Sequence, residues 1–431
     1  MIQANQFDVI VVGGGPAGST TAALLAEHAE KGRRVILFEK ERFPRYHVGE
    51  SLMPFCYFPL ERLGVLPEMD RLGFTQKLSV QFVTQDGGQS EPFYFFQHND
   101  HPSSTTWQVN RDEFDLMLLE NAKSKGAQVR QETRVKKFLK GEAGEVIGVE
   151  AELSDGQSIE YFATVTIDAT GRDTMAVSKH QWRERDPKLN KVAVWTYYRG
   201  AKRDEGLASG STTVAYLPDR GWFWYIPLKD DVVSVGIVAE RDYLFSKSRD
   251  PETIMAKCIE ENIWIKDHLK VGEQFGDYWV TGEYSYRSRY CATDGLVLVG
   301  DAFAFLDPVF SSGVFFALKS GQMAADAVHT ALDEGDCSAN RFDAYGERMC
   351  EGVELMRKIV YAFYDESFSF GKLIRKYPGL RPDLTDCLIG NLEKHDFQEL
   401  VRAMGEFAQM PGELSHGRRG FAGVPAALPE V

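Results

Sequence analysis

The sequence has few cysteines and no cysteine motif. Among its 431 residues, six are cysteines and none forms a C-x-x-C pair; they are Cys56, Cys258, Cys291, Cys337, Cys350 and Cys387. This scatter disfavours a dithiol redox motif and a zinc-ligand set, and it predicts reduced thiols rather than a disulfide framework. We therefore expect no metal site.

The chain also lacks a long apolar run and an excess of basic residues. No stretch approaches the roughly 20 apolar residues that span a bilayer. The first apolar run, residues 7–12, has no basic flank of the kind that precedes a signal peptide. The net charge of −14 disfavours polyanionic partners. We expect a cytoplasmic protein that binds neither nucleic acid nor membrane.

What the sequence does contain is a mixture of buried strands and helices. Residues 7–12 and 34–39 are short apolar runs rich in β-branched residues, and they predict parallel strands on either side of an Ala- and Leu-rich helix. Similar runs return at residues 164–170 and 295–299. Between them, residues 191–238 form short alternating runs that predict an antiparallel sheet.

This order predicts an α/β fold in which a Rossmann-like dinucleotide-binding domain is interrupted by an antiparallel substrate-domain sheet and followed by C-terminal helices. We place the discontinuous cofactor domain at residues 1–75, 110–185 and 285–335, the substrate-domain sheet at 76–109 and 186–284, and the C-terminal helical region and tail at 336–431.

A glycine motif joins the first predicted strand to the first helix. Gly13, Gly15 and Gly18 form G-x-G-x-x-G, which allows a tight turn, a close approach to a pyrophosphate and close packing of helix on strand. Glu39 ends the second strand about 20 residues later, where a carboxylate bonds a ribose hydroxyl. The motif predicts an adenine dinucleotide but does not distinguish NAD from FAD.

Later features favour FAD. Asp301 follows a buried strand, residues 168–171 read D-A-T-G, and Arg111 opens a predicted helix. With these features, residues 7–330 resemble the flavoprotein monooxygenases. The resemblance implies that Asp301 bonds the ribityl chain of FAD and that a helix near Gly313 points its N–H groups at the isoalloxazine. Asp301 alone would equally fit a turn or an N-cap.

Three motifs narrow the resemblance to the flavin-dependent halogenases. They are R-Y-H-V-G-E-S-L at residues 45–52, W-x-W-x-I-P at 222–227 and L-D-P-V-F-S-S-G-V at 306–314, and Lys77 is a fourth feature. The sequence is more similar to the pyrrole and phenol halogenases, because Phe310 stands where the tryptophan halogenases carry a glutamate. The substrate implied is a phenol or a pyrrole, free or on an acyl or peptidyl carrier protein. The base that removes the ring proton stays open.

The resemblance also implies a mechanism. Reduced FAD and O2 form a flavin hydroperoxide, and chloride or bromide attacks it to give hypohalous acid. Trp222 and Trp224 lie two apart on a strand and so on one face, where they would separate flavin from substrate; two aromatic residues in a sheet core would show the same pattern. Lys77 would meet the oxidant, either as an ammonium or as a neutral amine with a depressed pKa that forms a haloamine. Ser312 and Gly313 would hold the halide through their backbone N–H groups.

The predicted site therefore has three sets of residues. The catalytic residues are Lys77, Trp222 and Trp224, and the halide lies at Ser312 and Gly313. The cofactor-binding residues are Gly13, Gly15, Ala17, Gly18, Glu39, Lys40, Arg45, Gly49, Glu50, Ser51, Arg111, Asp301, Gly313 and Val314.

Partners and alternatives follow from the same features. No second dinucleotide motif is apparent, so we expect a separate flavin reductase to supply reduced FAD. A geranylgeranyl-reductase-like or aromatic-hydroxylase-like FAD enzyme is the main alternative, and a catalytically silent flavin-binding scaffold is another. The aromatic-bearing helices predicted within residues 341–410 would close over a free phenol, whereas an open mouth with basic residues would fit a carrier-bound substrate.

Overall fold

The computed structural model describes residues 5–27, 33–217, 221–282, 285–394, 396–412 and 414. Its first large sheet has eight strands, in the order β18-β19-β10-β1-β2-β7 with β9 and β8 added beside β10. The strands are β1 (Gln6–Val12), β2 (Val35–Phe38), β7 (Gln128–Arg130), β8 (Arg134–Lys140), β9 (Val146–Glu152), β10 (Ser158–Asp168), β18 (Ala292–Thr293) and β19 (Leu296–Leu298).

The centre of this sheet is parallel, as its apolar runs predict. Strand β1 pairs in parallel with β2 and β10, and β10 pairs in parallel with β19. Helix α1 (Pro16–Ala26) is buried along its whole length beneath α9 (Ser312–Glu334). A Cβ added to Gly321 of α9 would lie 2.7 Å from the Ala17 carbonyl oxygen, so this glycine allows the close approach of the two helices.

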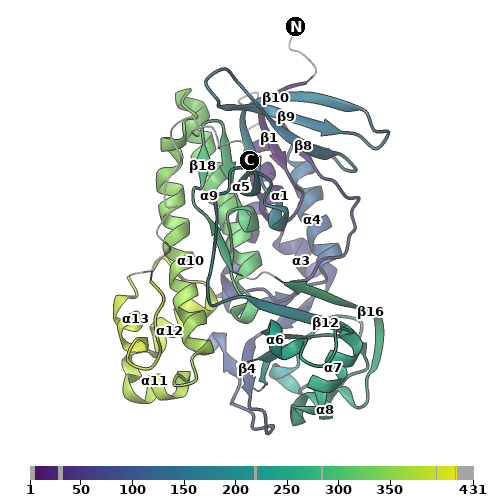
Figure 1. Ribbon diagram of the computed structural model, residues 1–431, viewed down its shortest axis with the longest axis vertical. Helices are drawn as coiled ribbons and strands as arrows, with labels where there is room; N and C mark the ends of the chain where they lie inside the picture. Colours follow the sequence, from purple (N-terminus) through teal and green to yellow (C-terminus); the bar gives the residue numbers. More distant parts are fainter. Residues whose placement is uncertain are drawn as a thin grey trace.

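A second sheet of seven strands lies at the other end of the molecule, in the order β16-β12-β15-β14-β13-β4-β5 (Figure 1). It is antiparallel except that β4 and β13 pair in parallel, which the sequence did not predict. Its strands are β4 (Ser79–Val83), β5 (Phe93–Tyr94), β12 (Lys191–Arg199), β13 (Thr212–Tyr216), β14 (Trp222–Pro227), β15 (Val232–Glu240) and β16 (Glu273–Gly282).

Two small sheets lie between the large ones. One of them joins β3 (Thr75–Lys77) to β6 (Thr106–Gln108), and β3 is separate from β4, which begins two residues later. The other small sheet joins β11 (Arg183–Arg185), β17 (Tyr286–Ser288) and β20 (Ala304–Phe305). Lys77 therefore ends a strand of its own two-stranded sheet rather than lying within the large one.

Helices cover both sheets. Those before α9 are α2 (Tyr57–Leu63), α3 (Leu66–Leu72), α4 (Arg111–Ser124), α5 (Met175–Lys179), α6 (Arg241–Leu244), α7 (Pro251–Glu260) and α8 (Ile263–Leu269). The predicted C-terminal helices are α10 (Asp343–Tyr364), α11 (Phe370–Lys376), α12 (Arg381–Ile389) and α13 (Gln398–Met404). Helix α10 runs beside α9, and α11 to α13 gather at its end near the second sheet (Figure 1).

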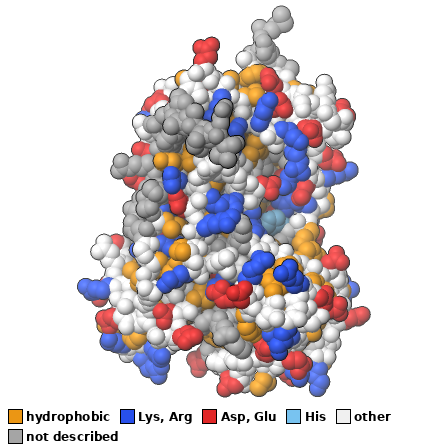
Figure 2. All heavy atoms as spheres, in the orientation of Figure 1, with side chains coloured by type: hydrophobic (Ala, Val, Ile, Leu, Met, Phe, Trp, Pro, Cys, Tyr) orange, Lys and Arg blue, Asp and Glu red, His pale blue; other side chains and the backbone are white. Residues whose placement is uncertain are grey.

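The mixed α/β fold with C-terminal helices confirms the predicted fold class. The limits of the three regions stay predictions, and the predicted tail lies outside the described residues except for 411, 412 and 414. All six cysteines are free thiols. Within the described ranges, no helix has the length and apolarity needed to cross a membrane. On the face shown in Figure 2, acidic and basic side chains are interspersed over the described residues rather than gathered by sign.

Candidate active site

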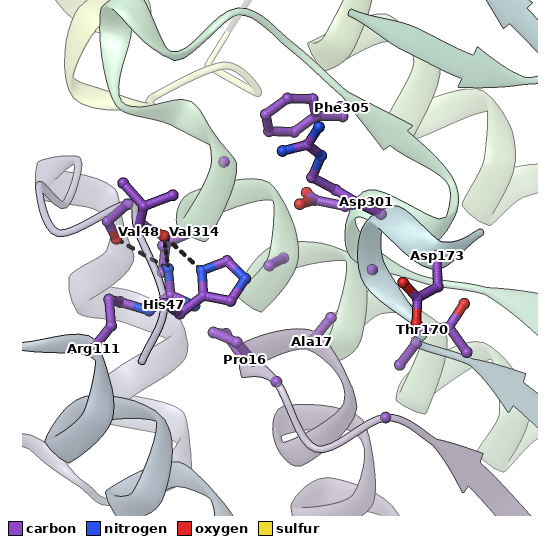
Figure 3. Close-up of a pocket in the computed structure, with 18 of the residues that line it drawn as sticks. Pro16, Ala17, His47, Val48, Arg111, Thr170, Asp173, Asp301, Phe305 and Val314 are labelled. Atoms are coloured by element: carbon purple, nitrogen blue, oxygen red, sulfur yellow. Dashed lines mark hydrogen bonds between the residues drawn. The ribbon is translucent and has the colours of Figure 1, made fainter. Parts of the chain in front are cut away.

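A cavity of about 690 Å³ opens at the carboxyl ends of the parallel strands and extends to the tryptophans of β14. This edge of a parallel sheet is where such folds bind their ligands. The residues that directly follow β1, β2, β10 and β19 line it, namely Gly13, Glu39, Ala169 and Val299, and so does Asp301 two residues further on. In Figure 3 the segment with His47 and Val48 lies across the cavity from Asp301, with Pro16 and Ala17 between them.

The three glycines of the loop have different roles. Gly13 has a φ of +109°, and a Cβ there would lie 2.3 Å from the Ala169 carbonyl oxygen; a Cβ on Gly18 would lie 1.9 Å from the Gly13 carbonyl oxygen. A Cβ on Gly15 would meet only the Arg45 guanidinium, at 3.7 Å. Gly13 and Gly15 line the cavity and Gly18 does not. Gly18 is thus required by packing, while Gly15 leaves space for a ligand.

Two carboxylates face the cavity. Glu39 accepts hydrogen bonds from Gly14 N–H at 2.7 Å and Glu41 N–H at 2.8 Å. Asp301 lies in η8 (Gly300–Ala302), and among the described residues its carboxylate has no hydrogen-bond partner. Burial raises the pKa of Asp301 to about 6, against the charges of nearby arginines. A carboxylate left free beside a glycine loop fits a hydroxyl-rich chain such as ribityl, and the N-cap of η8 is Val299, not Asp301.

An arginine clamp holds the segment that covers the cavity. Arg111 donates to the carbonyl oxygens of Val48 at 2.9 Å and Gly49 at 3.0 Å (Figure 3), and to both carboxylate oxygens of Asp115 at 2.8 and 3.0 Å. The His47 side chain lies exposed at the cavity edge, where partial desolvation and the nearby guanidinium groups lower the pKa of its ring. The ring is therefore neutral at pH 7, and the clamp supplies the fixed positive charge.

The same segment continues into Glu50, a buried acid. The Tyr197 hydroxyl donates to Glu50 Oε1 at 2.5 Å, and Oε2 has no partner among the described residues. Burial raises the pKa of Glu50. The cavity wall thus carries a carboxyl group that keeps its proton to a higher pH than an exposed glutamate.

The tryptophans of β14 form one wall of the cavity. Trp222 and Trp224 line it together with Ile226, whereas Phe223 and Tyr225 pack into the core on the other face of the sheet. The Trp224 indole donates to Ser234 Oγ at 3.0 Å. On the neighbouring strand, a Cβ on Gly236 would lie 2.1 Å from the Trp224 ring. The two side chains therefore share a face, as their spacing predicts, and Gly236 makes room for one of them.

Lys77 lies directly behind this cavity. Its side chain is 2% exposed, and its Nζ donates to Ser51 Oγ at 2.8 Å and to the Leu52 carbonyl oxygen at 3.0 Å. Ser51 and Thr212, whose hydroxyls are 2.8 Å apart, line the cavity, but Lys77 does not. Burial lowers the pKa of Lys77 to about 7. The structure thus excludes a solvated surface lysine and places the amine one hydrogen bond behind the wall.

The predicted halide residues lie at the start of α9. Ser311, with a φ of 58°, precedes the helix without a capping side-chain hydrogen bond. The first N–H groups of a helix have no partner within it. Gly313 and Val314 line the cavity, and a Cβ on Gly313 would meet nothing within 4 Å; Ser312 is buried and does not line it. The helix start can therefore receive an anion, chiefly at Gly313.

Aromatic rings from the C-terminal helices pack close to this point. Phe363 of α10 and Phe370 of α11 lie 5.8 and 6.1 Å, between ring centroids, from Phe310. Phe370 also lies 6.0 Å from Phe82 of β4. The helices α10 and α11 therefore pack against the turn that precedes α9 and against β4.

Of the predicted cofactor-binding residues, all but Gly18 line the cavity. Sequence reasoning missed several other lining residues. Trp195, Thr212 and Val214 belong to alternating strands, a pattern that gives no reason to single them out. Tyr46 and His47 stand inside a motif already noted, which was the signal that could have found them. Also missed were Thr170, Arg172, Phe305 and Pro308.

This geometry agrees with comparisons to known proteins. Residues 8–104 and 96–369 match the family model described as tryptophan halogenase. The chain belongs to this family, the flavin-dependent halogenases, and is a flavoprotein oxidoreductase. The sequence prediction of the family is confirmed.

Individual relatives cover almost the whole chain. A chlorinase of pyrrole-2-carbonyl groups on a peptidyl carrier protein, from Pseudomonas fluorescens, is 30% identical over 99% of both chains. The corresponding brominase from Pseudoalteromonas luteoviolacea is 32% identical over 90% of this chain and 92% of its own. Among solved structures, the flavin-dependent brominase Bmp2 matches with a TM-score of 0.84 and 29% identity over 93% of this chain and 98% of its own. The myxobacterial chondrochloren halogenase CndH, an FAD-dependent halogenase, matches at 0.78 and 31% over 94% and 96%.

Proposed function

We propose that the protein uses reduced FAD, O2 and chloride or bromide to halogenate an electron-rich aromatic ring, with hypohalous acid guided to Lys77. The observation that carries this proposal is the position of the Lys77 amine. The amine is buried behind Ser51, and Ser51 lies on the wall of a cavity that fits a dinucleotide. The pKa of Lys77 is lowered to about 7.

The chain's own groups would hold the cofactor at the sheet edge. The N–H groups at the start of α1 would bind the pyrophosphate, Glu39 a ribose hydroxyl and Asp301 the ribityl chain. Arg111 would keep residues 48 and 49 over the flavin. When bound, the reduced flavin would supply the oxidation of halide by O2.

The remaining residues would control where the oxidant goes. The start of α9, at Ser312 and Gly313, would hold the halide by backbone N–H groups. Trp222 and Trp224 would prevent direct contact between substrate and flavin, because their indoles occupy the wall. Hypohalous acid would pass Ser51 and Thr212 to reach Lys77.

Near pH 7 the amine of Lys77 exists in both protonation states. The ammonium would hydrogen-bond the oxygen of hypohalous acid and polarise the halogen. The neutral amine would instead attack the halogen, forming an N–halogen bond as the halogen–oxygen bond breaks, and the departing hydroxide would take the amine proton to leave as water. Either form leaves an electrophilic halogen beside Lys77, where an electron-rich ring can attack it.

The substrate that we propose is a phenol or a pyrrole. Two relatives that align with nearly the whole chain have names that give carrier-bound pyrroles as their substrates. The packing of Phe363 of α10 and Phe370 of α11 against Phe310 supports the other possibility, a small free substrate covered by these helices. Both forms of substrate therefore belong in the test.

The test is a turnover experiment read by mass spectrometry. The anaerobic protein receives reduced FAD, then O2 with bromide or chloride, and a panel of free phenols, free pyrroles and a pyrrole-2-carbonyl group on a carrier protein. We expect a halogen on one of these classes. Hydroxylated product instead of halogenated product would contradict the proposal.

The supply of reduced flavin is a separate point. We propose that a separate reductase delivers it. The cytoplasmic location expected from the sequence also stays a prediction. NADH alone should give no turnover, and addition of a flavin reductase should restore it. Rapid oxidation of NADH by the purified protein would contradict the need for a partner.

A further inference from the structure

The hydroxyl group of Tyr364, at the end of α10, joins three parts of the site. The indole N–H of Trp222 donates to Tyr364 Oη at 2.8 Å, and that hydroxyl donates to Asp307 Oδ2 at 2.9 Å. The other carboxylate oxygen, Asp307 Oδ1, accepts from Val309 N–H at 3.1 Å. One hydroxyl thus connects the tryptophan wall with the turn η9 (Pro308–Phe310), which leads into α9.

Both ends of this relay are buried, and Tyr364 between them is partly exposed. Trp222 is 2% exposed and Asp307 is fully buried. Next to Tyr364, the ring of Phe363 lies 6.5 Å from the Trp222 ring and 5.8 Å from Phe310, between centroids. The last turn of α10 therefore packs one ring against the wall and places one hydroxyl behind it.

The direction of the hydrogen bonds is fixed by chemistry. An indole N–H only donates, so the tyrosine oxygen must accept from Trp222 and give its own proton to Asp307. Burial and the Asp307 charge raise the pKa of Tyr364 well above its ordinary value, so the hydroxyl keeps that proton. Loss of the hydroxyl would leave the Trp222 indole N–H and one oxygen of the buried Asp307 carboxylate without this partner.

The turn held by Asp307 ends where α9 begins. Ser311 follows η9 with a φ of 58°, and the N–H groups assigned to the halide come directly after it. A shift of the Asp307 carboxylate would therefore move the turn that presents them.

We propose that Tyr364 is a positioning residue that holds the Trp222 indole in the flavin wall and fixes the turn that presents the halide-binding N–H groups. The docking of α10 would then set both the barrier between flavin and substrate and the affinity for halide. This inference rests on the proposed function, since that proposal assigns the wall and the halide their roles.

The test compares two tyrosines of the same helix. Tyr364→Phe removes the bridging hydroxyl and keeps the ring. Tyr361→Phe is the matched control, because its hydroxyl also donates to a buried aspartate, Asp186 at 2.6 Å, but does not contact the wall. Tyr364→Phe removes two hydrogen bonds and Tyr361→Phe removes one. The free energy of unfolding of both variants is therefore measured alongside, so that a general loss of stability is separated from an effect on the site.

The first readout needs no flavin. In protein carrying ¹⁵N-labelled tryptophan, seven indole N–H signals are expected, and Trp222→Phe identifies the one from Trp222. Tyr364→Phe should shift that signal, while Tyr361→Phe should leave it in place. A Trp222 signal that does not move in Tyr364→Phe would overturn the proposal.

The second readout is halide binding and coupling. We expect Tyr364→Phe to weaken bromide binding, followed by quenching of the bound oxidised flavin's fluorescence, about tenfold. It should also lower halogenated product per O2 by about the same factor, with H2O2 rising. Tyr361→Phe should stay within about twofold of wild type on both measures.

Equal effects of the two variants would make Tyr364 a merely structural residue and overturn the proposal. Failure of the proposed function looks different. Wild-type protein would then halogenate nothing, but the indole signal and the bromide titration would still decide whether the relay exists.

Discussion

Lys77 is a buried cation without an anion. Among the described residues it forms no ion pair; its amine donates to a hydroxyl and a carbonyl oxygen and lies 5.9 Å from the centre of the Phe95 ring. Such burial costs stability, because the charged form loses its hydration. A lysine kept in this setting is a candidate for chemistry rather than for stability.

The stability cost has a definite pH dependence. The folded pKa of about 7 lies below the ordinary value of 10.5, so the unfolded chain binds more protons between these values. The cost is full below pH 7 and fades as the pH rises towards 10.5. We expect Lys77→Met to stabilise the protein at pH 6 by on the order of 2–4 kcal/mol and by much less near pH 10. Urea unfolding at both pH values measures this, and equal destabilisation at both would contradict the assignment.

The same titration should appear in the chemistry. Between pH 6 and 8 the neutral fraction of an amine with a pKa of about 7 rises about tenfold, and the ammonium fraction falls by the same factor. We expect the halogen-transfer rate in a single turnover to change by about that factor, upward for a haloamine and downward for a polarising ammonium. A rate without a step near pH 7 would be inconsistent with Lys77 as the transfer site.

At the scale of elements, the tryptophan wall on β14 depends on a glycine of the neighbouring strand β15. Trp224 of β14 faces Gly236 of β15 in the register, and a Cβ at Gly236 would lie 2.1 Å from the indole. Gly236→Ala must therefore displace the ring or the strand. We expect it to lower halogenated product per O2 and to destabilise the fold by about 1–3 kcal/mol.

Gly282→Ala is the matched control for that variant. Gly282 also lies in this sheet, and a Cβ there would meet only Val192, at 3.8 Å. It should leave product formation near the wild-type level and stability within about 0.5 kcal/mol. If Gly236→Ala kept wild-type product formation and stability, the position of the Trp224 ring would not be needed for halogenation.

At this scale, the sequence could predict those features that depend on residues close together in the chain. The glycine loop, Glu39 and the spacing of Trp222 and Trp224 are short-range patterns, and the structure brings these residues to one cavity. Gly236 and Tyr364 act through strand register and helix docking, which no local pattern encodes. Lys77 was singled out only by family resemblance, and its burial became visible only in three dimensions.

At the scale of the molecule, buried ions anchor the C-terminal helices. Arg357 of α10 donates to Asp186 Oδ2 at 2.7 Å and pairs with Glu354, and Tyr361 donates to the other oxygen of Asp186. All three charged groups are at most 4% exposed. The predicted order of regions could not reveal this contact, because residue 186 and α10 are far apart in the sequence.

Removing one partner of such a pair leaves a buried charge. We expect Asp186→Ala to destabilise the protein by about 3–5 kcal/mol, because Tyr361 loses its acceptor and Arg357 keeps only Glu354 as a carboxylate partner. Urea unfolding followed by far-UV circular dichroism measures the loss. A change below about 1 kcal/mol would mean that α10 is held by its apolar contacts alone.

The central claim is that the oxidant forms at the flavin and acts at Lys77. The most direct measurement follows Lys77→Ala and wild type side by side with reduced FAD, O2, bromide and the substrate identified by mass spectrometry, recording O2 consumed and halogenated product. We expect the variant to consume reduced FAD and O2 within about twofold of wild type and to lose at least about 99% of product. Normal halogenation by Lys77→Ala would contradict the account.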